Sequence, residues 1–160
     1  MSWFISLIIK IKLKLTKRKN PLLLEIDENY NPAVTEEGEE FFPNGYFVFN
    51  ITKMLNFISS NKEIFELKNI NIKEYRSSTA VINESHVDKV DITVPIILAE
   101  ISPGRYNVID GNHRIEKAYR SGTETIPAYV LTMRQHLPFL TTVEAYRAYV
   151  GYWNEKVMLS

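Results

Sequence analysis

A mixed α/β fold is the class that the sequence predicts, on the strength of two neighbouring patterns. The stretch VPIILAEI, residues 94–101, is almost continuously apolar, which is typical of a strand buried on both faces. NHRIEKAYRSG, residues 112–122, places apolar side chains at helical spacing and ends at Gly122, a common helix terminator. With 160 residues, of which 45% are hydrophobic, the chain can bury one substantial core. We therefore expect one small α/β (α+β mixed) domain with a mixed sheet.

The other elements follow from the same periodicities along the chain. Alternating or continuous apolar patterns predict extended segments or strands at residues 46–49, 65–72, 94–101, 106–110 and 125–131. Apolar spacings of three and four predict helices near residues 51–60, 84–90, 112–121 and 141–157. Asn50 stands where it would cap the first of these helices. Thr141 and Glu144 stand in capping-box register at the start of the last, amphipathic helix.

The first 24 residues differ in charge from the rest of the chain. They hold six basic residues and no acid, whereas residues 25–160 carry a net charge of −6. Within them, IIKIKLKLTK alternates apolar and basic residues, which is the periodicity of a strand on the domain or at a partner interface. A membrane-surface anchor and a disordered tail are the alternatives. The acidic main body argues against a general nucleic-acid binder.

Composition divides the chain into an N-terminal portion and a domain. Residues 20–44 contain three prolines and the acidic cluster EEGEE, which predicts a linker or a long surface loop. We therefore expect a basic arm or strand plus an acidic linker at residues 1–44, and the folded domain at residues 45–160. The chain has no cysteine, so it forms no disulfide and no thiolate site. This composition suits a reducing compartment, and we expect a cytoplasmic protein.

The turn with the sequence DGNHR, between a predicted strand and a predicted helix, carries the candidate chemistry. The first turn of a helix offers unpaired backbone N–H groups and the positive end of the helix dipole, which together bind anions. Gly111 lets a ligand approach the backbone, and Asn112 and His113 can donate hydrogen bonds. Arg114 offers a bidentate fork for phosphate or carboxylate. Asp110 can cap the helix, hold a magnesium ion, or orient its neighbours. A purely structural turn, with Arg114 paired to an acid, is the alternative.

A longer pattern surrounds this turn. Its features, in order, are Pro95-Ile96, Asp110-Gly111, His113-Arg114, Gly122 and Ile126-Pro127. This pattern resembles the ParB/sulfiredoxin superfamily, and most closely the Asp-Gly-x-His-Arg variant of ParB-like free serine kinases. The likeness covers residues 94–131 and extends back toward Ile64. It covers neither residues 1–45 nor the C-terminal helix.

The resemblance implies a domain that binds a nucleoside triphosphate, ATP or CTP, with magnesium, and that acts as a phosphotransferase or nucleotide hydrolase. It assigns phosphate binding to Gly111, Asn112, His113 and Arg114. It gives Asp110 a place in the site without a defined task. We take Asp110 and His113 as the candidate catalytic residues, with Asp110 as the candidate metal ligand. The helix-turn-helix segment and the Arg- and Gln-rich box of chromosome-partitioning proteins are missing, so DNA clamping is not expected. The sulfiredoxin cysteine is missing too, so that chemistry cannot operate.

Other side chains are weaker candidates for function. Glu74 and Glu84 are candidate bases for activating a hydroxyl, and His86 is a candidate to approach the site, although all three suit an ordinary surface role. His136 is assigned no role. An aromatic stripe on the last helix predicts core packing and also permits a protein partner, as does the N-terminal arm; it consists of Tyr146, Tyr149, Tyr152 and Trp153.

Two further functions remain open beside nucleotide binding. A non-enzymatic interaction module, such as an immunity, adaptor or regulatory protein, would keep the fold and use the arm or the aromatic helix to hold a partner. A nuclease is the third reading and the weakest, because no acid cluster with metal-ligand spacing accompanies Asp110 in the sequence.

Overall fold

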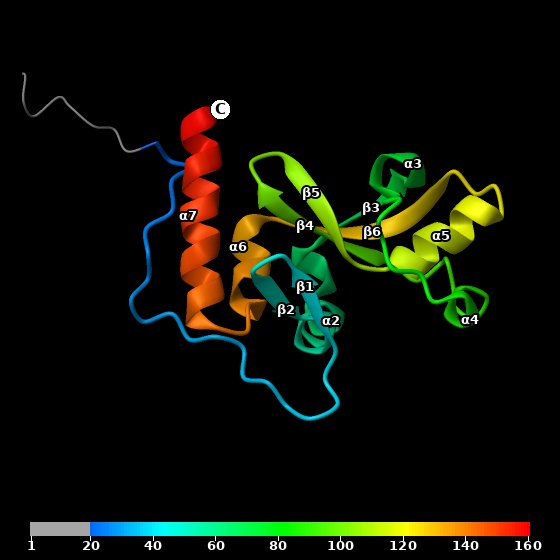
Figure 1. The fold of residues 1–160 in the computed structure, drawn as a ribbon, viewed down its shortest axis with the longest axis horizontal. Coiled ribbons are helices and arrows are strands. Elements are labelled where there is room, and N and C mark those ends of the chain that lie inside the picture. The colour runs from blue at the N-terminus through cyan, green and yellow to red at the C-terminus, as the bar shows by residue number, and fades with distance from the viewer. Residues whose placement is uncertain (1–19) are drawn as a thin grey trace, which may run out of the picture.

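The computed structural model describes residues 20–160 and confirms the mixed α/β class (Figure 1). The predictions made for residues 1–19, namely an added strand, a partner or membrane-surface contact, or a tail, lie outside the described residues. Four strands form the main sheet and two form a separate hairpin. Buried apolar side chains form one cluster on each face of the main sheet.

The main sheet is mixed, with the strand order β3-β6-β4-β5. Its strands are β3 (Glu66–Asn71), β4 (Ile96–Ser102), β5 (Arg105–Asp110) and β6 (Thr125–Leu131). The central strands β4 and β6 are parallel, and β3 and β5 pair antiparallel with them at the two edges. β4 is buried at every position except Glu100, as its apolar sequence predicts. Because side chains alternate along a strand, Ile96 belongs to one core cluster and Ile97 to the other.

Helix α5 (Asn112–Arg120) covers one face of the sheet, and two short helices contact it, α3 (Ile72–Tyr75) and α4 (Glu84–Val87). α5 buries Ile115 and Ala118 in the core on this side. Gly122 follows the helix with a φ of 74°, as expected for a glycine that ends a helix. The predicted strand–turn–helix–strand unit is therefore confirmed.

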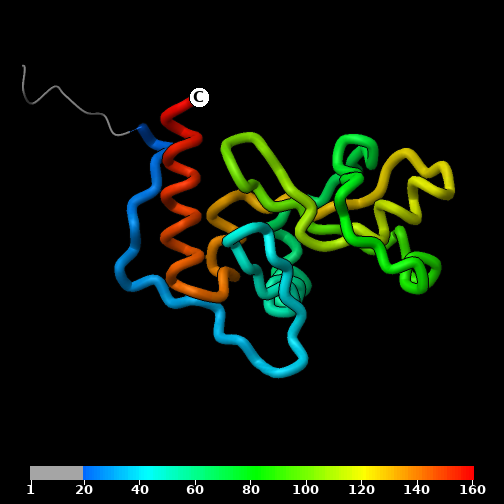
Figure 2. The backbone as a smooth tube through the Cα atoms, viewed as in Figure 1, coloured from blue at the N-terminus to red at the C-terminus, as the bar shows by residue number. Residues whose placement is uncertain are grey.

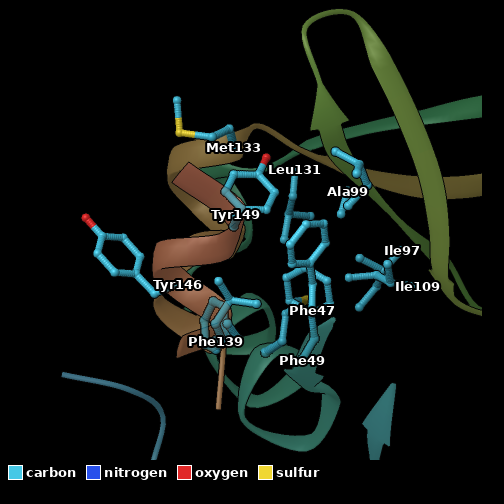
Figure 3. Close-up of a cluster of buried hydrophobic side chains, with 14 of the residues drawn as sticks. Phe47, Phe49, Ile97, Ala99, Ile109, Leu131, Met133, Phe139, Tyr146 and Tyr149 are labelled. Carbon is cyan, nitrogen blue, oxygen red and sulfur yellow. The ribbon is translucent and has the colours of Figure 1, made fainter. Parts of the chain in front are cut away.

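The larger core lies on the other face, where the hairpin and the remaining helices pack (Figure 3). These elements are β1 (Phe41–Asn44), β2 (Phe47–Asn50), α2 (Ile51–Ser60), α6 (Met133–His136) and α7 (Val143–Leu159). A short 3₁₀ turn, Lys62–Ile64, connects α2 to β3, and a second, Leu137–Phe139, connects α6 to α7. Tyr146, Tyr149 and Trp153 are at most 5% exposed, so most of the predicted aromatic stripe of α7 lies in the core.

Residues 20–33, which we call the N-terminal strap, lie along α7 (Figures 1 and 2). The Asn154 side chain accepts from the Leu24 N–H at 2.8 Å and donates to the Leu24 carbonyl at 2.9 Å. The Tyr30 ring stacks on Tyr146 with 3.9 Å between ring centroids. β1 then pairs with β2, so the boundary predicted at residue 44 falls inside a hairpin. Residues 20–40 therefore form a long surface segment bound to the domain, as the surface-loop alternative predicted, and residues 41–44 form a strand of the hairpin.

Two local predictions can be compared directly with the structure. Asn50 caps α2, because its side chain accepts from the Lys53 N–H at 3.0 Å, as predicted. The capping box predicted at Thr141 is wrong by one residue. Thr142 is the N-cap of α7 and accepts from the Ala145 N–H at 3.0 Å, whereas the Thr141 hydroxyl donates to the Val48 carbonyl at 3.3 Å.

Candidate functional site

The DGNHR turn joins β5 directly to α5, and its geometry requires glycine. Gly111 has a φ of 110°, in the left-handed region, and is the N-cap of α5. A Cβ at this position would lie 2.3 Å from Ile96 Cγ2, a separation that real Cβ atoms do not show. Since Gly111 has no side chain, it accepts no side-chain capping bond from the first-turn N–H groups. Those groups point outward from the helix start, where an anion can bind them.

Asp110 and Arg114 bind each other across this turn. The Arg114 guanidinium donates through Nη2 to Asp110 Oδ2, and the two side chains are 16% and 17% exposed. Arg114 Nε is buried and has no hydrogen-bond partner among the described residues. The arrangement resembles the structural alternative considered for the turn, in which Arg114 pairs with an acid.

His113 has different partners. The backbone N–H of Asn83 donates to His113 Nε2 at 3.0 Å. The rings of His113 and His86 lie edge to face, with 4.9 Å between their centroids. Because Nε2 accepts a hydrogen bond, a neutral His113 carries its proton on Nδ1. His86 therefore does approach the predicted site, as a neighbour of His113 rather than of Asp110.

Asn112 is the residue of the turn that lines an open cleft of about 810 Å³. One wall of the cleft comes from the first hairpin, with Phe42, Pro43 and Asn44. A second comes from the edge strand β5, with Tyr106, Asn107 and Val108. The third is the last turn of α3 together with the segment after it, with Glu74, Tyr75, Arg76, Ser77, Thr79, Ala80 and Val81. The cleft thus combines aromatic walls with hydroxyl, amide, guanidinium and carboxylate groups, beside the start of α5.

The segment between α3 and β4 is fastened onto α5 by a set of charged contacts. Glu116 of α5 accepts from Arg76 Nε at 2.9 Å and from Arg120 Nε at 2.9 Å. These two hydrogen bonds hold the pKa of the Glu116 carboxyl below its usual range although burial acts in the opposite direction. Glu84, a predicted candidate base, accepts from Arg120 at 2.6 and 2.9 Å. Lys117 Nζ donates to the carbonyl of Val90 at 2.8 Å.

The other predicted candidates do not all line the cleft. Glu74 is exposed and lies on the cleft lining. Within residues 20–160, no group of three or more His, Asp and Glu side chains is arranged to hold a metal ion. Asp110 is therefore a single carboxylate that is at present paired with Arg114.

His136 is a residue whose role the sequence did not reveal. It is fully buried, and its Nε2 lies 2.7 Å from the Glu100 carbonyl, to which Tyr149 also donates at 2.7 Å. A carbonyl only accepts, so Nε2 carries the proton, and the buried Nδ1 has no partner in the described part of the chain. Burial lowers the pKa of His136 to about 4. No local motif marks such a residue, because its partners are 13 and 36 positions away.

No protein-family model matches the sequence, and no curated protein matches it. Within residues 20–160, no helix is both long and apolar enough to cross a lipid bilayer.

Proposed function

We propose that this chain is a ParB-like domain that binds a nucleotide or another phosphorylated small molecule in the cleft beside α5. One observation carries the proposal: Asn112, in the uncapped first turn of α5, lines a cleft of about 810 Å³. Small-molecule sites are typically concave, occupy roughly 300–1,000 Å³ and combine apolar walls with a few polar groups. The helix start supplies N–H donors and partial positive charge for a phosphate.

The residues of the DGNHR turn have distinct roles in this proposal. Gly111 lets the phosphate approach the backbone, and Asn112 donates from its side chain. His113 contacts a phosphate only after exchanging its present partner, the Asn83 N–H. Arg114 is bound to Asp110 and does not line the cleft. Asp110 Oδ1 accepts no hydrogen bond from Arg114 and is the oxygen that a cation would use.

A magnesium ion fits this site only together with a nucleotide. Asp110 offers one carboxylate, and no cluster of three or more ligand side chains accompanies it in residues 20–160. Magnesium often binds through one or two carboxylates plus substrate phosphates, so ATP or CTP would complete its coordination. Phosphoryl transfer or nucleotide hydrolysis therefore depends on whether the Asp110 carboxylate can hold the ion beside its contact with Arg114.

The Asp110–Arg114 pair also favours a second function, a non-enzymatic interaction module. In such a module the pair fixes the turn and does not open, and the chain binds a partner or a ligand without turnover. Phosphate or ADP release separates the two functions. Binding of a triphosphate without product release, with and without magnesium, supports the module.

A thermal-shift screen of nucleoside triphosphates, with and without magnesium, tests the proposal, because a ligand that binds the folded state raises Tm. Asn112→Ala removes one donor to a charged group, worth about 1.5–3 kcal/mol, and should lower affinity roughly tenfold to a hundredfold. Asn56→Ala, at an exposed position of α2 that does not line the cleft, is the matched control. Equal affinity of both variants and the parent chain would contradict the proposal.

A further inference from the structure

Arg76 is the cation on the lining of the cleft, and no sequence motif singles it out. It follows α3 as the C-cap residue, and its side chain is 34% exposed. Its guanidinium lies over the Tyr119 ring, with 4.0 Å from Cζ to the ring centroid. The side chain therefore has a fixed position at the junction of the cleft and α5.

Glu116 holds Arg76 by one edge. Arg76 Nε donates to Glu116 Oε2 at 2.9 Å, and Nη2 lies 3.4 Å from Glu116 Oε1. Nη1 has no hydrogen-bond partner among the described residues. Glu116 is itself 10% exposed and is fixed from its other side by Arg120. An arginine held in this way loses little side-chain entropy when it binds an anion, and its outer edge keeps its donors.

Arg114 is placed differently. Its guanidinium is bound to Asp110, and its Nε lies 3.1 Å from the point where a Cβ of Gly111 would stand. Arg114 does not line the cleft, whereas Arg76 and Asn112 both do. Neutralising an anion in the cleft through Arg114 would leave the mostly buried Asp110 carboxylate without its partner, which is costly. Arg76 keeps Glu116 as its partner when its outer edge binds.

We infer that the phosphate of the ligand binds at Arg76 and that Arg114 is a structural residue of the turn. This inference rests on the proposed function. Three neighbouring donors on the same lining complete the site: the Ser77 and Thr79 hydroxyls, 2.9 Å apart, and the Asn112 amide. The aromatic side chains Phe42 and Tyr106 lie on the other two walls of the cleft and suit a planar ring, such as a nucleotide base. The ligand class is therefore a phosphorylated compound with a planar ring.

Isothermal titration with ATP, CTP and inorganic phosphate tests the inference on the full chain. Arg76→Gln should weaken the better-bound triphosphate at least tenfold, because Gln keeps a donor but loses the charge. Arg76→Lys should lose less, since the charge remains and the planar fork is lost. Arg105→Gln is the matched control: it removes the same charge from an exposed position of β5 outside the cleft lining. It should change affinity less than twofold.

Arg114→Lys distinguishes the two arginines. It should lower Tm and keep nucleotide affinity within a few-fold, because its role is to hold Asp110. Arg76→Gln with unchanged affinity, in a chain that still binds a triphosphate, overturns the inference and leaves the proposed function standing. A folded Arg114→Lys variant that loses as much affinity as Arg76→Gln also overturns it. Absence of binding by the parent chain removes the proposed function and the inference together. Binding of inorganic phosphate alone, equal in Arg76→Gln and the parent chain, counts against the Arg76 site as well.

Discussion

Gly111 fixes the backbone on which the candidate site depends. Its φ of 110° is strained for any residue with a Cβ, and that Cβ would meet Ile96 at 2.3 Å. Gly111→Ala should therefore destabilise the fold, by about 1–3 kcal/mol from backbone strain alone and by more from the clash. Urea unfolding measures the loss. Gly151→Ala is the matched control, because Gly151 lies in α7 with nothing within 4 Å of an added Cβ. The free energy of unfolding of that variant should rise by about 0.5–1 kcal/mol. Equal stabilities would contradict this account of the turn.

His136 makes stability depend on pH. Its pKa of about 4 in the folded state lies below the ordinary 6.5, because burial disfavours the imidazolium. Between these values the unfolded chain binds more protons than the folded one, so stability is full above about pH 6.5 and falls as pH drops toward 4. The loss over this window is about 3 kcal/mol. Urea unfolding at pH 7 and pH 5 should show the part of this loss that falls above pH 5, about 2 kcal/mol.

His136→Gln provides the control for that measurement, since Gln can donate to the Glu100 carbonyl and does not titrate. The variant should be less pH-sensitive than the parent chain between pH 7 and pH 5. His86→Gln, at an exposed position, should keep the parent's pH dependence. If the stability of His136→Gln depends on pH as strongly as that of the parent chain, the assignment to His136 is wrong.

At the scale of elements, the N-terminal strap and α7 form one unit. Asn154 binds both backbone groups of Leu24, and Trp153 Nε1 donates to the Leu22 carbonyl at 2.7 Å. Asn154→Ala leaves the Leu24 N–H and carbonyl without these partners and should cost roughly 1–3 kcal/mol. Amide hydrogen exchange should accelerate at Leu24 in this variant, and it should stay unchanged in Glu155→Ala, an exposed neighbour. Unchanged exchange at Leu24 would show that the strap is held by other contacts.

The elements that sequence predicted well are those defined by local patterns. Strand β4 follows from one apolar run, and α5 follows from helical spacing that ends before Gly122. The strap was predicted only as a linker or a long surface loop because its partners are 107 and 131 positions away, namely the Leu137 carbonyl for Tyr30 and the Trp153 side chain for Leu22. Proline and acidic residues indicate only the local conformation of the chain. They do not reveal that a helix distant in sequence packs against this segment.

The candidate site was predictable to a similar extent. The DGNHR string identifies a strand-to-helix turn, and the need for Gly111 is evident from its position before the helix. The pairing of Asp110 with Arg114 was foreseen only as an alternative. The contact of Arg76 with Glu116, 40 positions away, could not be foreseen, because it depends on how the segment after α3 folds back onto α5. Local sequence located the turn, and tertiary packing decided which of its neighbours line the cleft.

At the scale of the whole molecule, two cores enclose the main sheet and leave the cleft at its β5 edge. The larger core anchors the hairpin that forms one wall, and the smaller core anchors α5 and the segment that forms another. The cleft is therefore bordered by elements from both faces of the sheet. A ligand that binds there would contact both, so ligand binding should stabilise the molecule as a whole rather than one lobe.

Mapping of nucleotide binding by ¹H–¹⁵N NMR tests the central claim most directly. The protein, uniformly labelled, is titrated with ATP and CTP in the presence of magnesium. We predict the largest shifts at the amides of Asn112 and His113 and in residues 76–81, with the strap and α7 unaffected. No shift up to concentrations on the order of millimolar, which corresponds to a free energy weaker than about −4 kcal/mol, would contradict the claim. The largest shifts on α7 or in the strap would contradict it equally, because they would place the ligand away from the cleft.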